Sequence, residues 1–287
     1  MGRWMKATLA ATAVALTGGP ALAQSNWSKP AEPFHVIDNV WYVGTEGLSA
    51  FLFTTPEGHI LLDGATPEGA PIIEANIAKL GFKLSDVKIL LNSHAHFDHS
   101  GGLAKLKHDT GATLAAMEGD VSALEGGFYL GSEDVKSMNA PPVKVDRVLK
   151  DGDTVKLGEF TLTAHLTPGH SRGCTSWGAT LGDQGKWYEA MVFCSATVAA
   201  NRITPPLQYE GIVEDYRKTF TKTKEMKVDI PLAPHPEFFQ LREKAAKAAA
   251  NRQALNPFIE PGAFLALITK LEGDFERTLK ERSAPKQ

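Results

Sequence analysis

The run His94-Ala95-His96-Phe97-Asp98-His99-Ser100-Gly101-Gly102 is the most informative stretch of this 287-residue chain. It brings three imidazoles and one carboxylate together within six residues. Neutral imidazole and carboxylate are ligands that zinc and similar metal ions prefer. Just before it, residues 87–91 (Val-Lys-Ile-Leu-Leu) predict a buried strand. We therefore predict a metal site at the carboxyl end of that strand. A solvated polar loop is the alternative, but it leaves the two glycines without a role.

Two histidines far along the chain extend this site. His170 follows residues 160–166, which alternate apolar and polar as a strand does, and His235 follows the apolar residues 228–232. A lone loop histidine is ordinarily solvated. His170 and His235 are therefore candidate ligands only because of the prolines or glycine that flank them and because of their order in the chain. Six donors suffice for two adjacent metal ions with open coordination positions, the layout of a hydrolytic centre. They are His94, His96, Asp98, His99, His170 and His235.

The rest of the chain predicts a layered α/β fold with helices outside the sheets. Strands are expected within residues 34–63 and at 87–91, 160–166, 187–193 and 228–232, and helices at 68–80, 102–110, 211–226, 237–252 and 261–281. The candidate ligands all follow predicted strands, which places them at one edge, where loops on a rigid sheet commonly carry function. Asp63 ends another strand and is expected to support a histidine or to close a turn.

The first 23 residues predict a secretory signal peptide. Arg3 and Lys6 precede the apolar stretch 7–16, and Ala21-Leu22-Ala23 forms a cleavage pattern. The apolar stretch is shorter than the roughly 20 residues that span a bilayer. We expect residues 1–23 to be removed, residues 24–287 to form a single domain, and the protein to be periplasmic.

The net charge and the two cysteines indicate which binding partners and which cellular compartment to expect. The net charge is −3 and there are no basic runs, which argues against nucleic-acid or anionic-membrane binding. We expect a monomer, because no long exposed apolar stripe is evident. Cys174 and Cys194 could form a disulfide, remain buried thiols, or give a metal ligand at Cys194; the exported context favours the disulfide.

The pattern His-x-His-x-Asp-His-x-Gly-Gly after a buried strand is similar to the metal-binding motif of the metallo-β-lactamase fold superfamily. The resemblance covers essentially the whole mature chain, since Asp63, before the motif, and His170 and His235, after it, also appear in the expected order. It implies a four-layer αβ/βα sandwich with the metal centre between the edges of two sheets.

Residues 191–197 (Met-Val-Phe-Cys-Ser-Ala-Thr) distinguish branches of that superfamily. Thioesterases and lactonases of the fold typically carry a bridging aspartate at the end of this strand, and here no carboxylate stands there. The full histidine set without a sulfur ligand resembles the third subclass of class B β-lactamases. The stretches 168–177 and 193–195 also look like that subclass, which implies a Cys174–Cys194 disulfide.

The resemblance implies two zinc ions, the first held by His94, His96 and His170 and the second by Asp98, His99 and His235. It implies that a zinc-bound hydroxide oriented by the catalytic Asp98 opens the β-lactam ring of penicillins, cephalosporins and carbapenems. Ser195 and Thr197 match positions that bind the substrate carboxylate, although such residues also commonly satisfy local backbone groups. The alternatives are a thioesterase or lactonase on the same centre and a non-catalytic zinc protein.

Overall fold

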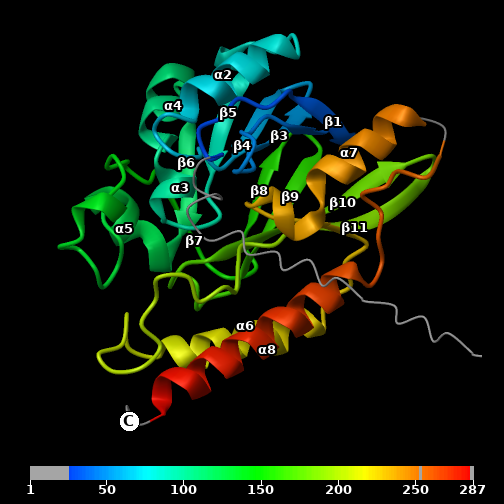
Figure 1. Cartoon of the computed structure of the whole chain (residues 1–287). Coiled ribbons are helices and arrows are strands. Elements are labelled where there is room, and N and C mark those ends of the chain that lie inside the picture. Colours follow the sequence, from blue (N-terminus) through cyan, green and yellow to red (C-terminus); the bar gives the residue numbers. More distant parts are fainter. Residues whose placement is uncertain (1–25, 252–253, 285–287) are drawn as a thin grey trace, which may run out of the picture.

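Two β-sheets lie face to face between outer layers of helices in the computed structural model, which describes residues 26–251 and 254–284 (Figure 1). The predicted four-layer αβ/βα sandwich is confirmed. The predicted signal peptide, residues 1–23, lies outside the described residues. None of the described helices is long and apolar enough to cross a membrane.

The first sheet has seven strands in sequence order. They are β1 (Phe34–Ile37), β2 (Val40–Tyr42), β3 (Phe51–Thr55), β4 (Gly58–Leu62), β5 (Val87–Leu91), β6 (Thr113–Met117) and β7 (Arg147–Leu149). Neighbours from β1 to β4 are antiparallel, and those from β4 to β7 are parallel, so β4, β5 and β6 end at the same edge. The helices of this half are α2 (Ala70–Lys79), α3 (Phe97–Ser100), α4 (Leu103–Thr110) and α5 (Val121–Gly126).

The second sheet has five strands in the order β12-β11-β10-β9-β8. These are β8 (Thr154–Leu157), β9 (Phe160–Leu166), β10 (Thr175–Asp183), β11 (Lys186–Val192) and β12 (Ile230–Leu232). Only the β11–β12 pair is parallel, so both of these strands also end at one edge. Three helices accompany this half, namely α6 (Ile212–Lys224), α7 (Leu241–Ala250) and α8 (Ala263–Ser283).

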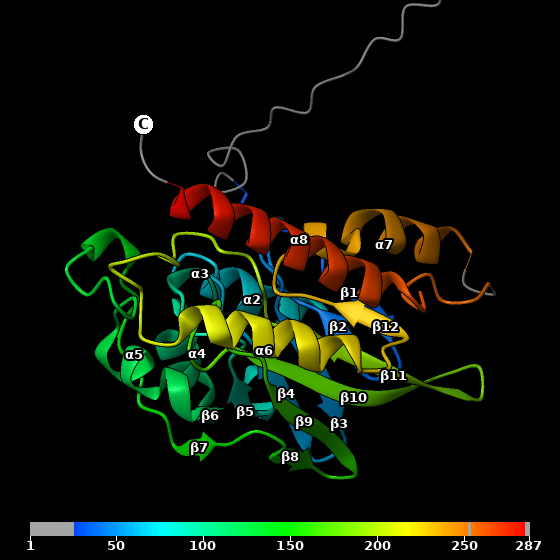
Figure 2. The same cartoon turned by 90° about the horizontal axis from the view of Figure 1, so that it is seen from below.

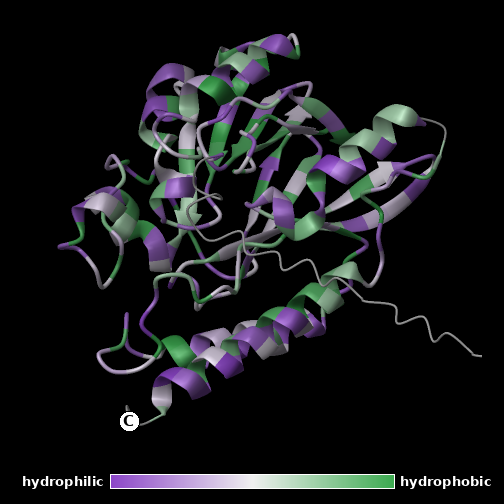
Figure 3. Cartoon of the chain, viewed as in Figure 1, coloured by the Kyte–Doolittle hydropathy of each residue, from purple (hydrophilic) through white to green (hydrophobic). Residues whose placement is uncertain are grey.

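Successive side chains of each strand point to opposite faces of the sheet, and this alternation produces the layers. On β3, Phe51 and Phe53 belong to the core between the sheets, whereas Leu52 belongs to the core beneath the helices of the first half. Because successive side chains of a strand point to opposite faces, a strand covered on both sides reads as continuously apolar. Figure 3 shows much green on the central strands and mixed colours on the outer helices.

A third core joins α6 and α8 to the second sheet. Phe193 follows β11 and contacts Phe264 of α8, and Tyr216 of α6 stacks on Phe275 of α8 with ring centroids 4.7 Å apart. Figures 1 and 2 show the two helices side by side along this face. The C-terminal helix is therefore part of the folded core.

The predicted elements occur with small shifts. The helix expected at 237–252 begins only at Leu241, because His235 leads into a 3-10 turn at Pro236–Phe239 and Gln240 adopts a positive φ of 55°. The strands β6, β7, β8 and β10 were not predicted. Two of them, β7 and β8, are short and half exposed, so their apolar pattern is weak.

Replacing Phe275 by Ala is expected to lower the free energy of unfolding by about 3–5 kcal/mol, because it leaves a cavity against Tyr216 and Phe220. Leu265→Ala on the same helix is the control, since Leu265 is half exposed and its loss should cost far less. Urea denaturation measures both. Equal, small losses would show that α8 does not belong to the cooperative core.

Candidate metal centre

Every predicted ligand lies after a strand, at the edge where the two sheets meet; Asp98 and His99 lie in the short helix α3, and the other four in loops. In the first sheet, Asp63 follows β4 and the 94–99 run follows β5. In the second sheet, His170 follows β9 and His235 follows β12. The structure thus brings together donors that are distant in the sequence; His99 and His235, 136 residues apart, have Nε2 atoms 3.1 Å from each other.

The first triad consists of His94, His96 and His170. Their ring centroids are 4.6 Å apart in all three pairs, and their ligand atoms lie within 4.8 Å of one another. The His94 Nδ1 atom lies 3.1 Å from the Ser93 hydroxyl, whereas His94 Nε2 is buried with no hydrogen-bond partner among the described residues. A buried nitrogen without a partner is costly unless something binds it, which fits a metal ligand.

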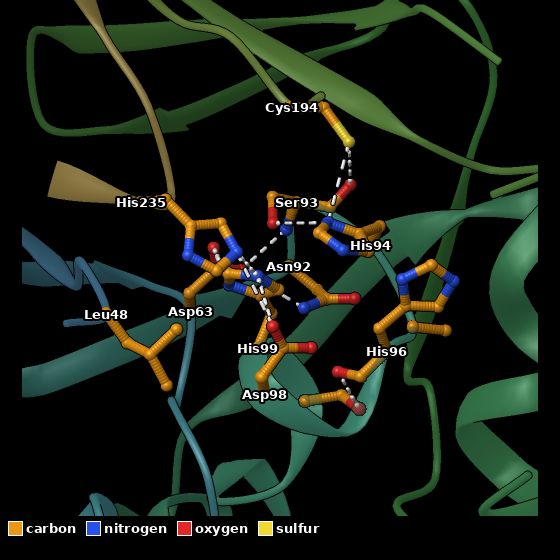
Figure 4. A network of polar contacts seen from close by, with 12 residues as sticks. Leu48, Asp63, Asn92, Ser93, His94, His96, Asp98, His99, Cys194 and His235 are labelled. Atoms are coloured by element: carbon orange, nitrogen blue, oxygen red, sulfur yellow. Dashed lines mark hydrogen bonds and ion pairs between the residues drawn. The ribbon is translucent and has the colours of Figure 1, made fainter. Parts of the chain in front are cut away.

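The second triad consists of Asp98, His99 and His235 (Figure 4). The Nε2 atoms of His99 and His235 are 3.1 Å apart, and Asp98 Oδ2 lies 3.3 and 3.4 Å from them. Ligands at about 2.0–2.1 Å from a tetrahedral zinc ion are about 3.3–3.4 Å from one another. The second triad therefore has the dimensions of one zinc site, and the donor set of both triads fits zinc.

Burial sets the protonation of the first triad. Burial, reinforced by neighbouring imidazoles, holds the pKa values of His94 and His96 well below the ordinary histidine value. Burial also lowers the pKa of His170 to about 4. All three rings are consequently neutral at pH 7, which is the form that binds metal.

Electrostatic interactions between neighbouring side chains set the protonation states in the second triad. Burial alone would raise the pKa of Asp98, but His99 and His235 outweigh it and hold that pKa well below its usual range. Burial alone would lower the pKa of His99, yet Asp98 and Asp63 raise it. Asp98 is thus an ionised carboxylate between two imidazoles.

Asp63 lies behind the second triad, as predicted for a supporting residue. Its Oδ2 atom is 3.6 Å from His99 Nδ1, and its Oδ1 accepts hydrogen bonds from the Ser93 backbone and the Asn92 side chain. Burial raises the pKa of Asp63. This carboxylate ties the start of the 94–99 loop to the end of β4.

The Gly101-Gly102 pair has a steric role. A Cβ atom on Gly102 would lie 2.2 Å from the Gly64 carbonyl oxygen, so only glycine lets the two loops approach. The Gly64 amide donates to the His99 carbonyl, and the Gly102 amide donates to the Ala65 carbonyl. The loop that carries Asp98 and His99 is therefore fixed on the loop after β4.

Cys174 and Cys194 form a disulfide, as the resemblance implies. The alternatives of free thiols or a metal-binding Cys194 are thus wrong for this structure. Figure 4 shows Cys194 next to His94, and Cys194 Sγ lies 3.6 Å from His94 Nδ1. The disulfide therefore packs directly behind a first-triad histidine.

Thr197 lies beside His170, and Ser195 contacts Thr197. Their hydroxyl oxygens are 3.2 Å apart, and Ser195 Oγ accepts a hydrogen bond from the Thr197 amide. The Thr197 carbonyl lies 2.7 Å from His170 Nδ1, which leaves His170 Nε2 for a metal. The local backbone role considered for these residues is therefore present, and contact with a substrate stays a prediction.

Three residues that the sequence did not indicate support the first triad. Tyr129 stacks on His96 with ring centroids 4.1 Å apart, and its hydroxyl donates to Asn201. The Asn201 amide donates in turn to the His170 carbonyl. Asp120 joins the loops of His94–His96 and His170. The apolar residues 114–117 before Asp120 resemble the strand before Asp63, a signal that could have found it.

Trp27 covers part of the site next to the second triad. Its ring centroid lies 6.0 Å from that of His235 and 5.8 Å from that of Phe97. Trp177, by contrast, is fully buried and donates to the Asn92 carbonyl, as expected of a core residue.

An αβ/βα sandwich with two buried triads of imidazole and carboxylate ligands at the edge of its sheets defines a metal-dependent hydrolase. Residues 43–182 match the family model of the metallo-β-lactamase superfamily. The fold is similar to BJP-1, a subclass B3 metallo-β-lactamase of Bradyrhizobium japonicum, at 49% identity and a TM-score of 0.89, covering 91% of this chain and 98% of that one. It is also similar to FEZ-1 from Legionella gormanii at 38% identity and a TM-score of 0.84, covering 90% of this chain and 98% of that one. The chain belongs to the metallo-β-lactamase superfamily and resembles its subclass B3 enzymes.

More distant similarity reaches the thioesterases of the fold. A hydroxyacylglutathione hydrolase of Methylococcus capsulatus is 25% identical over 222 residues, 67% of this chain and 74% of that protein. The hydroxyacylglutathione hydrolase of Hyphomonas neptunium is 32% identical, over 38% of this chain and 34% of its own length.

Replacing both Cys174 and Cys194 by Ala is expected to lower the free energy of unfolding by roughly 3 kcal/mol, because the loop between them loses its cross-link. The folded variant should bind as much zinc as the parent, since neither sulfur is a thiolate ligand. Chemical denaturation and elemental analysis measure the two effects. Loss of one equivalent of zinc from the folded variant would contradict this assignment.

Proposed function

We propose that this protein is an exported dizinc β-lactamase that hydrolyses the amide bond of penicillins, cephalosporins and carbapenems. The observation that carries the proposal is the pair of ligand triads, three imidazoles in one and two imidazoles with a carboxylate in the other. The overall similarity to subclass B3 enzymes along nearly their whole length supports the same reaction.

Each triad has its role in this proposal. His94, His96 and His170 would hold one zinc ion, and Asp98, His99 and His235 the other. When bound, zinc supplies Lewis acidity toward the lactam carbonyl and makes water acidic enough to ionise near pH 7.

Asp98 is the catalytic residue of the proposal. Its low pKa keeps the carboxylate ionised at working pH, so it can accept a hydrogen bond from the attacking water and orient it. Its Oδ2 atom lies 3.3 Å from His99 Nε2 and 3.4 Å from His235 Nε2, the spacing of three ligands on one ion, so the bound ion would hold the carboxylate in place. Because water is the nucleophile, the reaction needs no serine nucleophile or covalent intermediate.

Ser195 and Thr197 are proposed to bind the carboxylate of the substrate. The Thr197 hydroxyl lies 3.3 Å from His170 Nδ1 and 3.2 Å from the Ser195 hydroxyl, and two adjacent hydroxyl donors suit a carboxylate acceptor. Trp27 would contribute an apolar wall at the opposite triad.

A thioesterase is the second candidate, supported by the hydroxyacylglutathione hydrolases among the relatives. The end of β11 argues against it. Residues 191–197 contain no carboxylate at that strand end, where the thioesterases carry a bridging aspartate. The disulfide also supports export to an oxidising compartment such as the periplasm.

The proposal is tested by incubating the purified protein with a carbapenem and, separately, with a hydroxyacylglutathione thioester. We expect carbapenem hydrolysis that a chelator abolishes and zinc restores. Turnover of the thioester alone by the zinc-loaded protein would replace the β-lactamase proposal by the thioesterase one.

His235→Ala should remove one of two bound zinc ions and lower kcat/KM for the carbapenem. Loss of a residue that only supports a metal ligand costs roughly 10–100-fold, so loss of the ligand itself should cost at least as much. His108→Ala is the matched control, because the His108 side chain is exposed and pairs with Asp109, which belongs to neither triad. Elemental analysis and steady-state kinetics give the two readouts. A His235→Ala variant that keeps two zinc ions would remove His235 from the ligand set.

A further inference from the structure

Asp120 is a buried carboxylate whose side-chain hydrogen bonds within the described part of the chain lead to the two loops of the first triad. It ends the 3-10 turn Glu118–Asp120, directly after β6, the parallel neighbour of β5. The residue is 3% exposed. A buried carboxylate is costly unless its oxygens accept hydrogen bonds, so its partners reveal what it fixes.

Three donors converge on Asp120. Its Oδ2 atom accepts from the Ala95 amide at 2.9 Å and from the Ser171 hydroxyl at 2.8 Å. Its Oδ1 atom accepts from the Gly173 amide at 2.7 Å. Hydrogen bonds to an ionised acceptor are about twice as strong as neutral ones.

These donors are the immediate neighbours of the ligands. Ala95 stands between His94 and His96, and Ser171 follows His170. One carboxylate therefore connects the loop from the first sheet with the loop from the second, at the point where the two loops must bring three imidazoles to one ion. Asp63 has the corresponding position behind the second triad.

The backbone around Asp120 is shaped for this contact. A Cβ atom on Gly173 would lie 2.4 Å from the Asp120 amide nitrogen, and a Cβ atom on Gly119 would lie 2.6 Å from the Arg172 carbonyl oxygen. Only glycine at both positions allows the turn and the His170 loop to approach so closely.

We infer that Asp120 is the positioning residue of the first metal site, setting the separation of His94 and His96 from His170. It touches neither metal nor substrate in this role; it acts through the backbone of the ligand loops. The inference rests on the first zinc site of the proposed function. Outer partners of this kind commonly change metal affinity by about 10–100-fold when they are replaced.

The test is Asp120→Asn in the full protein. Asparagine keeps the shape but places an NH2 group where one oxygen accepts, so an amide of Ala95 or Gly173 or the Ser171 hydroxyl loses its acceptor. We expect zinc affinity of the first site, measured by competition with a chromophoric chelator, to fall about 10–100-fold. The ligand-field absorption of the cobalt-substituted protein should change as well.

Asp229→Asn is the matched control. Asp229 is also a buried carboxylate that accepts a backbone amide, that of Glu189 at 3.0 Å, but it precedes β12 at the end away from His235. It is expected to lower stability and leave zinc affinity and the cobalt spectrum unchanged. Equal weakening of zinc binding in both variants would overturn the inference, because the effect would then be general destabilisation.

Ser171→Ala keeps the carboxylate and removes one donor, so it decides the question even if Asp120→Asn does not fold. It should weaken the first zinc in the same direction by a smaller factor. Zinc affinity and cobalt spectra equal to those of the parent in the folded variants would overturn the inference. A parent protein that binds no zinc would instead contradict the proposed function, and this inference with it.

Discussion

The structure depends on holding imidazoles from two separate sheets around one small buried space. Charged and polar ligands are costly there unless each has a partner, and the loops that carry them have backbone amides to satisfy as well. Two buried carboxylates meet this demand. Asp63 fixes the start of the 94–99 loop behind His99, and Asp120 connects the same loop to that of His170. The disulfide packs against His94 from the second sheet.

The layers provide the rigid frame for that arrangement. Strands β4, β5 and β6 are covered on both faces and parallel, so their carboxyl ends deliver Asp63, the ligand run and Asp120 to one edge. The second sheet delivers His170 and His235 to the same edge, and α6 and α8 cover its outer face. The apolar cores thus fix the positions of the strand ends, and the polar residues at those ends form the metal site.

Much of this was predictable from local sequence. The ligand run after residues 87–91, the strand 160–166 before His170 and the apolar stripe of the last helix all have clear periodicity. The convergence of the six donors followed from their place after strands and from the family resemblance. What failed is tertiary: β7 and β8 are short and partly exposed, and the roles of Tyr129, Asn201 and Asp120 arise from contacts 25 to 72 residues away. Only Asp120 has a local signal, the apolar residues 114–117 before it, and nothing local indicates Tyr129 or Asn201.

The most direct measurement of the central claim is a crystal structure of the zinc-soaked protein with anomalous data at the zinc edge. The account predicts two anomalous peaks, one about 2.0–2.1 Å from nitrogens of His94, His96 and His170, and one at similar distances from Asp98, His99 and His235. A peak bound by other residues, or a second triad without a peak at saturating zinc, would contradict the arrangement of the six donors as two metal sites.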